Sequence, residues 1–140
     1  MKTTGGYDVL PIGRVHSELS QRHQAPKQGS EGAPDARLEI FPKFVAGLEG
    51  ITVGSTIIVL TWLHEAQRDV LRVHPRDDET RPQTGVFATR SSDRPNPVGL
   101  HRVAVLQVEP TGWLHVQGLE AINKTPVIDI KPVLHRLNDS

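Results

Sequence analysis

The chain contains no cysteine and no long apolar run. Without cysteine it can form no disulfide, thiolate nucleophile or cysteine metal site. No stretch approaches the roughly 18 apolar residues of a membrane helix, and the N-terminus lacks the charged and then apolar pattern of a signal peptide. At 140 residues, 36% of them hydrophobic, the chain fits one domain over residues 1–140 with one modest core. We expect a cytoplasmic protein without a membrane anchor.

Familiar cofactor and catalytic motifs are also missing. The sequence holds neither a G-x-G-x-x-G fingerprint nor a P-loop, which argues against a Rossmann fold and a P-loop nucleotidase. Seven histidines are present, but none stand in H-x-x-x-H or H-E-x-x-H spacing, so no metal site is predicted. A hydrolase is disfavoured because Ser91, Ser92 and His101 have no G-x-S-x-G elbow around them.

The net charge is zero, with 16 basic and 16 acidic residues. Nonspecific attraction to nucleic acid phosphates should therefore be weak. One exception is local, because the stretch 81–102 contains four arginines and a single acidic residue, Asp93. This excess of positive charge suits an anionic ligand, although a solvated surface loop would have the same composition.

Short apolar stretches separated by proline, glycine and aspartate predict an all-β protein. The clearest hairpin turn is Glu109, Pro110, Thr111 and Gly112. Many short strands with brief connections are typical of a barrel or a sandwich, and closure into a barrel would remove exposed edges. The expected strands cover residues 9–15, 36–41, 56–63, 70–73, 85–89, 102–108, 113–118 and 125–130.

Two stretches differ from this strand pattern. Residues 42–48 predict one short helix, with Pro42 at its start and Gly50 after its end. Residues 21–36 are rich in glutamine, glycine, proline and charge and are long for a plain connection, which is typical of functional loops.

The most informative segment is 85–100, GVFATRSSDRPNPVGL. Its two prolines restrict the loop, so little conformational entropy is lost when the loop holds a ligand. The planar guanidinium groups of Arg90 and Arg94 suit a carboxylate or phosphate, and Asn96 offers both a donor and an acceptor. In an alternative interpretation, both arginines bind backbone carbonyls or the aspartate of the loop and only hold the loop together.

This segment resembles the signature of the TrmO-like family, S-adenosylmethionine-dependent methyltransferases that act on N6 of threonylcarbamoyladenosine beside the tRNA anticodon. The typical run of that family is GVFATRSPxRPNPIGLS. Other motifs match in the same order, and the resemblance implies a small antiparallel β-barrel with one short helix. These motifs are PIGRVHS at 11–17, PKQG at 26–29, GLEG at 47–50, WLH at 62–64 and TPVIDIKP at 125–132.

The resemblance also implies a donor pocket made from separate segments, near the boundary between the subunits of a homodimer. Without the resemblance, His64 would equally suit a core or hydrogen-bonded histidine. No residue is identified as a general base, so the catalytic residue is left unassigned. The positions that match the family's S-adenosylmethionine contacts are Gln28, Gly29, Ser30, His64, Glu65, Arg90, Leu100, Gln117, Gly118, Leu119 and Glu120.

Acceptor binding is expected at a second set of positions. Arg94 and Asn96 belong to the signature segment, and Asp129 and Lys131 belong to the family's DIKP motif. The expected partner is the anticodon loop of tRNA. For Asp129 and Lys131, a structural salt bridge or two solvated side chains is an equal alternative.

The sequence departs from the family pattern at several positions. Ser92 stands where proline is usual, Val98 where isoleucine is usual and His101 where serine is usual. The chain ends eight residues after Pro132, so we expect a short form without the C-terminal extension of larger members. Contacts to the tRNA body would then be missing. Two alternatives follow: a methyltransferase for a small molecule, or a non-catalytic module that senses S-adenosylmethionine or a nucleotide.

Overall fold

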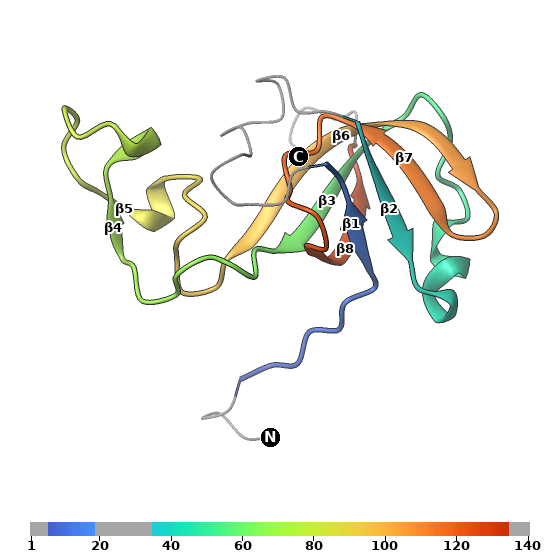
Figure 1. Ribbon diagram of the computed structural model, residues 1–140, viewed down its shortest axis with the longest axis horizontal. Helices are drawn as coiled ribbons and strands as arrows, with labels where there is room; N and C mark the ends of the chain where they lie inside the picture. The colour runs from blue at the N-terminus through green and yellow to red at the C-terminus, as the bar shows by residue number, and fades with distance from the viewer. Residues whose placement is uncertain (1–5, 19–34, 135–140) are drawn as a thin grey trace.

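Six antiparallel strands form a closed barrel in the computed structural model, which describes residues 6–18 and 35–134 (Figure 1). Around the barrel the strands follow the order β1-β2-β7-β6-β3-β8. The all-β barrel expected from the sequence is therefore confirmed. The barrel strands are β1 (Gly13–His16), β2 (Ala36–Ile40), β3 (Thr56–Trp62), β6 (Val98–Glu109), β7 (Trp113–Gln117) and β8 (Pro126–Pro132).

The core lies inside the barrel and in most strands follows from an alternating pattern, while β3 buries three consecutive residues, Ile57, Ile58 and Val59. Inward positions are apolar and outward positions are mostly polar, since successive side chains in a strand point to opposite faces. The side chains of Val15, Leu38, Val59, Leu114 and Val116 are fully buried. The outward neighbours in β1, β2 and β7 include the polar groups from which a site can be built, whereas the outward Ile58 of β3 is buried.

One end of the barrel is covered by the 3-10 helix η3 (Pro42–Leu48), which confirms the short helix expected at these residues. Gly50 adopts a φ of 99°, a conformation that favours glycine, directly after this helix. The predicted hairpin is also present, because the β6–β7 turn closes with the Gly112 N–H donating to the Glu109 carbonyl at 3.0 Å.

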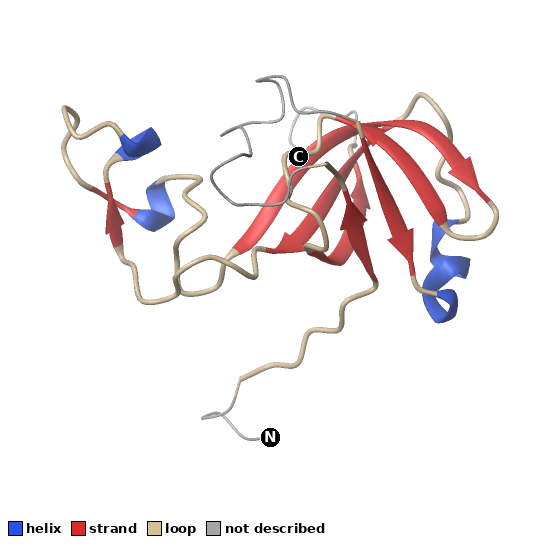
Figure 2. Ribbon diagram, in the orientation of Figure 1, coloured by secondary structure: helices blue, strands red, loops and turns tan. Residues whose placement is uncertain are grey.

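Residues 63–97, named here the arm, leave the barrel between β3 and β6 (Figures 1 and 2). The arm contains β4 (Arg72–Val73), η4 (Pro75–Asp77), β5 (Thr84–Gly85) and η5 (Val86–Ala88). Strands β4 and β5 pair with each other to form a separate small sheet. The arm therefore presents its residues apart from the barrel wall.

Three expected boundaries are wrong. Residues 85–89 are not a strand: β5 ends at Gly85 and η5 follows, because only Val86 of this stretch is buried and its carbonyl accepts from the Thr89 N–H. The first strand begins at Gly13, not at residue 9. Strand β6 begins at Val98, four residues earlier than expected, because it pairs with the end of β3. No helix among the described residues is long and apolar enough to cross a membrane.

Candidate functional site

The guanidinium of Arg94 holds the signature segment in shape. It donates from Nε to the Ser91 carbonyl at 2.9 Å and from Nη2 to the carbonyls of Thr89, at 2.6 Å, and Val86. These acceptors are backbone oxygens in and after η5, and the Val86 carbonyl also accepts from the Thr89 N–H at 3.1 Å. The geometry therefore matches the alternative in which this arginine stabilises its own loop, and its predicted contact with the acceptor stays a prediction.

A second arginine fixes the other half of the segment. Arg68 donates from Nε to the Pro95 carbonyl at 2.7 Å and from Nη2 to Oδ1 of Asn96 at 3.1 Å. Its guanidinium also lies 5.0 Å from the centre of the Trp62 ring, within the range of a cation–π contact. Asn96 is exposed, and its amide nitrogen is the donor that it can offer to a ligand.

Arg90 differs from both of these arginines. Its side chain is exposed on the arm, and within residues 6–18 and 35–134 no hydrogen bond or ion pair holds its guanidinium. A guanidinium group on a loop that is held in place by other contacts can donate two parallel hydrogen bonds to a carboxylate or phosphate. Arg90 is thus the signature residue that is available to an anionic ligand.

Further predicted residues lie at the barrel end where β3 stops and β6 begins. His64 and Glu65 follow β3 directly, with His64 Nε2 and Glu65 Oε2 separated by 3.9 Å and both side chains at least a third exposed. His64 is therefore not a core histidine. Leu100 is 46% exposed on the outer face of β6. An exposed apolar side chain beside charged groups can cover one face of an organic ligand.

The stretch from Gln117 to Glu120 follows β7, where Gln117 pairs with Ala104 of β6, six residues along that strand from its start at Val98. Gly118 adopts a φ of 98°, which turns the chain out of the strand. Leu119 is fully buried in the core, so only its backbone can contact a ligand. Gln117 is exposed and Glu120 is half-buried, and these two side chains are the ones that can reach a pocket.

The structure does not gather every predicted residue in one place. Arg90 lies on the arm, which extends away from the barrel that carries Leu100 and residues 117–120 (Figure 1). On β8 the half-buried Asp129 and the exposed Lys131 form an ion pair of 3.4 Å, the structural alternative considered from the sequence. Their acceptor-binding role stays a prediction. The positions Gln28, Gly29 and Ser30 lie outside the described residues.

A buried histidine occupies the barrel interior near this end. His101 is 6% exposed and shares a hydrogen bond of 2.7 Å between its Nε2 and Oγ1 of Thr61. Its Nδ1 is buried without a hydrogen-bond partner. Burial lowers the pKa of His101 from 6.5 to about 4, so the ring is neutral near pH 7. Gly99 faces both side chains, and an added Cβ would meet Thr61 Oγ1 and lie 2.7 Å from the imidazole.

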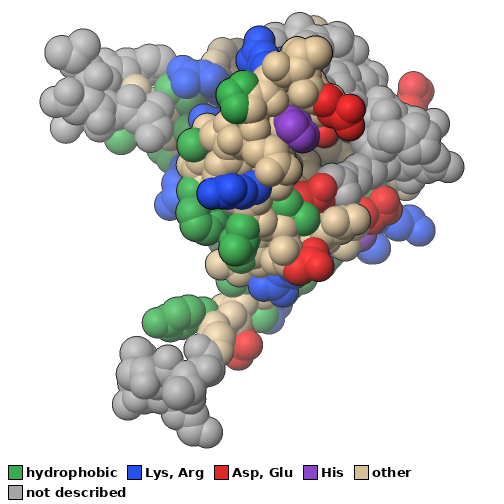
Figure 3. Space-filling view, turned by 90° about the vertical axis from the view of Figure 1, so that its left-hand side faces the viewer, with side chains coloured by type: hydrophobic (Ala, Val, Ile, Leu, Met, Phe, Trp, Pro, Cys, Tyr) green, Lys and Arg blue, Asp and Glu red, His purple; other side chains and the backbone are tan. Residues whose placement is uncertain are grey.

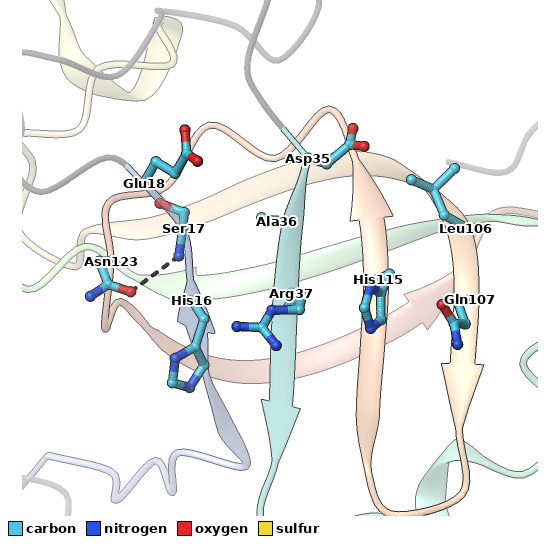
Figure 4. Close-up of a pocket in the computed structure, with 10 residues that line it drawn as sticks. All are labelled: His16, Ser17, Glu18, Asp35, Ala36, Arg37, Leu106, Gln107, His115 and Asn123. Atoms are coloured by element: carbon cyan, nitrogen blue, oxygen red, sulfur yellow. Dashed lines mark hydrogen bonds between the residues drawn. The ribbon is translucent and has the colours of Figure 1, made fainter.

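The outer wall of the barrel carries a hollow that none of the predicted site residues line. It has a volume of about 620 Å³ and runs across β1, β2, β7 and β6 (Figure 4). Sequence patterns could not reveal it, because its residues come from four strands and meet only through the register of the sheet. The sequence indicated only that most of these side chains point outward from their strands, because they alternate with buried residues. Among the described residues, no group of three or more His, Asp or Glu side chains could hold a metal ion.

The charged side chains on the side of the arm are of both signs. Basic, acidic and hydrophobic side chains intersperse there instead of forming one basic field (Figure 3). A single-sign field is what draws a nucleic acid backbone from a distance. Recognition at this face therefore depends on individual side chains.

Comparisons with known proteins identify the family. Residues 14–139 match the family model described as tRNA-methyltransferase O N-terminal domain, and the chain belongs to this family. A probable S-adenosyl-L-methionine-binding protein of Methanothermobacter thermautotrophicus is 44% identical over 89% of this chain and 88% of its own length. An S-adenosyl-L-methionine-binding protein of Archaeoglobus fulgidus is 45% identical over 88% of this chain and 86% of its own length.

Solved structures agree with this family assignment. The crystal structure of TrmO from Pseudomonas aeruginosa is 30% identical, with a TM-score of 0.74, and aligns with 96% of this chain. The aligned region is 58% of the Pseudomonas chain. The present chain therefore spans little more than half the length of that protein.

Proposed function

We propose that this member of the tRNA-methyltransferase O N-terminal domain family binds S-adenosylmethionine and transfers its methyl group to N6 of threonylcarbamoyladenosine in tRNA. The observation that carries the proposal is the different state of the two signature arginines. Arg94 is engaged with carbonyls of its own loop, while Arg90 is exposed and available. A loop that is braced in this way and leaves one guanidinium open is suited to bind an anionic group.

The predicted donor residues fit the chemistry of S-adenosylmethionine. Arg90 can bind the carboxylate of its amino acid part, since guanidinium and carboxylate pair in a fork. The carboxylates of Glu65 and Glu120 can accept from its ammonium group or its ribose hydroxyls. The exposed side chain of Leu100 can cover an apolar face of the adenine ring. The names of the two archaeal relatives support the same ligand.

The reaction makes modest chemical demands on the protein. When bound, the sulfonium donor supplies an activated methyl group with a good leaving group. The residues of this chain then need to orient the acceptor nitrogen toward that methyl group and exclude water. N6 of the acceptor belongs to a urea and is a weak nucleophile, so a nearby base that removes its proton would help. We leave that base unassigned.

A homodimer would unite the two parts of the donor site. Arg90 lies on the arm, and the arm also exposes Leu71 and Phe87, which are 63% and 79% exposed. Large exposed apolar side chains on a projecting segment are typical of an interface. If the arm of one copy reached the stretch that follows β7 in its partner, Arg90 of one chain and Glu120 of the other would share one pocket. Light scattering should then give twice the chain mass of 15.4 kDa.

Calorimetry tests donor binding. Titration with S-adenosylmethionine should give a micromolar Kd, about 8 kcal/mol, as for a preformed small-ligand pocket. Arg90→Ala should weaken binding by about 1 to 3 kcal/mol, the loss of a charge-assisted hydrogen bond. Arg72→Ala is the matched control, because Arg72 is also an exposed arginine of the arm. Equal effects of the two substitutions, or no heat at millimolar donor, would contradict the proposal.

Mixing two variants with weakened donor binding tests whether the site is shared. Arg90→Ala damages the arm side of the predicted pocket, and Glu120→Ala damages the barrel side. A mixed dimer would contain one intact pocket, so the mixture should recover part of the donor binding that each variant lacks alone. If both residues served the same chain's own pocket, mixing would recover nothing.

Transfer of label separates an enzyme from its alternatives. The protein is incubated with donor carrying a labelled methyl group and with tRNA that has or lacks the threonylcarbamoyl group. Label on N6 only in the carrying tRNA supports the proposal. Label in a metabolite extract but not in tRNA would indicate a small-molecule methyltransferase. Donor binding without any transfer would indicate a sensor.

A further inference from the structure

The hollow on the outer wall of the barrel is lined by a row of planar side chains. His16 of β1 is paired with Arg37 of β2, Arg37 with His115 of β7, and His115 with Gln107 of β6. Adjacent strands lie about 4.8 Å apart, so these four side chains stand next to one another across the sheet. Figure 4 shows them side by side on the same face.

A second row of side chains braces the first. The centres of the His16 and Trp113 rings lie 4.9 Å apart, and the guanidinium of Arg37 lies 4.9 Å from the centre of the Trp113 ring. Nε2 of His16 lies 2.8 Å from Glu39 Oε1. These contacts fix the orientation of the planes before any ligand arrives, which lowers the entropy lost on binding.

The third member of the row is held in the same manner. Nε2 of His115 lies 2.7 Å from Glu109 Oε2. In each histidine, one ring nitrogen is therefore engaged with a carboxylate, and the other ring nitrogen and the ring face can serve a ligand. The row ends at Gln107, beside a bulge in β6 between Val105 and Gln107 that leaves Leu106 42% exposed. Bulges of this kind occur next to binding sites, where they redirect a side chain.

The charged groups around the hollow indicate which part of a nucleotide it can bind. In the two rows, the guanidinium groups of Arg14 and Arg37 are balanced by the carboxylates of Glu39 and Glu109. Two more carboxylates, of Glu18 and Asp35, line the rim. With two guanidinium groups against four carboxylates, this surface is net acidic and does not attract phosphates. Its carboxylates and amides can instead accept and donate at base edges and at ribose hydroxyls.

We propose that this hollow, formed by His16, Arg37, His115 and Gln107, binds unpaired bases of single-stranded RNA by stacking and edge contacts. Proteins that bind single strands place aromatic rings or guanidinium planes on the outer face of a β-barrel, and each can stack one base. The choice of RNA rests on the proposed function. The hollow would hold bases of the loop other than the one that reacts.

Fluorescence anisotropy with a labelled anticodon stem-loop RNA tests the proposal in the absence of donor, so its outcome does not depend on methyl transfer. Arg37→Ala should weaken binding of the loop RNA about tenfold, because stacking on one side chain typically contributes that much. Arg37→Lys keeps the charge but lacks the plane and should lose most of the same affinity. Lys43→Ala is the matched control, since Lys43 also lies over an aromatic ring, that of Phe44, on η3.

Salt dependence separates stacking from a phosphate contact. If Arg37 stacks on a base, the slope of log K against log salt should be the same in the wild type and in Arg37→Ala, whereas a lost phosphate contact lowers it by about one. The fully paired stem alone should bind weakly to all variants. The proposal is wrong if Arg37→Ala and Lys43→Ala weaken binding equally, if the slope falls by about one, or if the paired stem binds as well as the loop. Thermal melting confirms that each variant is folded.

Discussion

Acidification should destabilise the barrel through His101, and the sign follows from its burial. In the unfolded chain its imidazole takes up a proton as the pH falls through about 6.5, while in the folded barrel its pKa is lowered to about 4. Between these values the unfolded state binds more protons than the folded state. The free energy of unfolding therefore decreases as the pH falls through this window and is fully retained above it.

The size of this effect can be worked out from the shift in pKa. Lowering the pKa from 6.5 to about 4 corresponds to about 3 kcal/mol, at about 1.36 kcal/mol per unit. Most of that loss occurs above pH 4.5. Below this value Glu39 also contributes, because hydrogen bonds from His16 and Arg14 lower the pKa of its carboxyl group from 4.5. Measurements between pH 7 and pH 4.5 thus report mainly on the buried histidine.

Urea unfolding at a series of pH values tests this reasoning against the variant His101→Ser. The variant should be less stable than the wild type at pH 7, because it leaves a cavity and loses the hydrogen bond to Thr61. Its free energy of unfolding should change far less between pH 7 and pH 4.5, since the remaining titrating groups are common to both proteins. Parallel pH profiles of the two proteins would refute the assignment to His101.

Two other substitutions probe how the site is supported. Gly99→Ala should destabilise the protein by about 1 to 3 kcal/mol in urea unfolding, because the new methyl group would collide with Thr61 and His101; an unchanged midpoint would show that the barrel end relaxes freely. Arg94→Ala should loosen the arm by about 2 kcal/mol, since three backbone carbonyls lose a charged donor. Hydrogen exchange should then speed up at amides of the arm and not in the barrel, whereas exchange that is unchanged in the arm would contradict the bracing role.

The barrel could be predicted from the sequence because strands such as β2 and β6 alternate between buried and exposed residues. Inward positions such as Val103 and Val105 and outward positions such as Arg102 follow the period of two that defines a half-buried strand. The same rule failed at residues 85–89. Small and apolar residues also alternate there, but the segment buries only Val86 and turns instead of pairing. Whether such a segment forms a strand or a turn depends on whether a partner strand lies beside it, and the local sequence does not show this.

The candidate site was only partly predictable for a similar reason. Arg90 and Arg94 are chemically identical, and only the folded loop shows that one of them is engaged with the carbonyls of η5. The planar row depends on the register that pairs His16 with Arg37 and Arg37 with His115. These residues are separated by long stretches of sequence, so no spacing along the chain brings them together. Resemblance to the family supplied the donor positions that neither periodicity nor spacing could supply.

A comparison of tRNA nucleosides from cells with and without the gene tests the proposed function most directly. Mass spectrometry should detect N6-methylated threonylcarbamoyladenosine only when the gene is present, and a gene carrying Arg90→Ala should restore much less of it than one carrying the control substitution Arg72→Ala. Equal amounts of the methylated nucleoside with and without the gene, in cells that have no second methyltransferase of this family, would contradict the account.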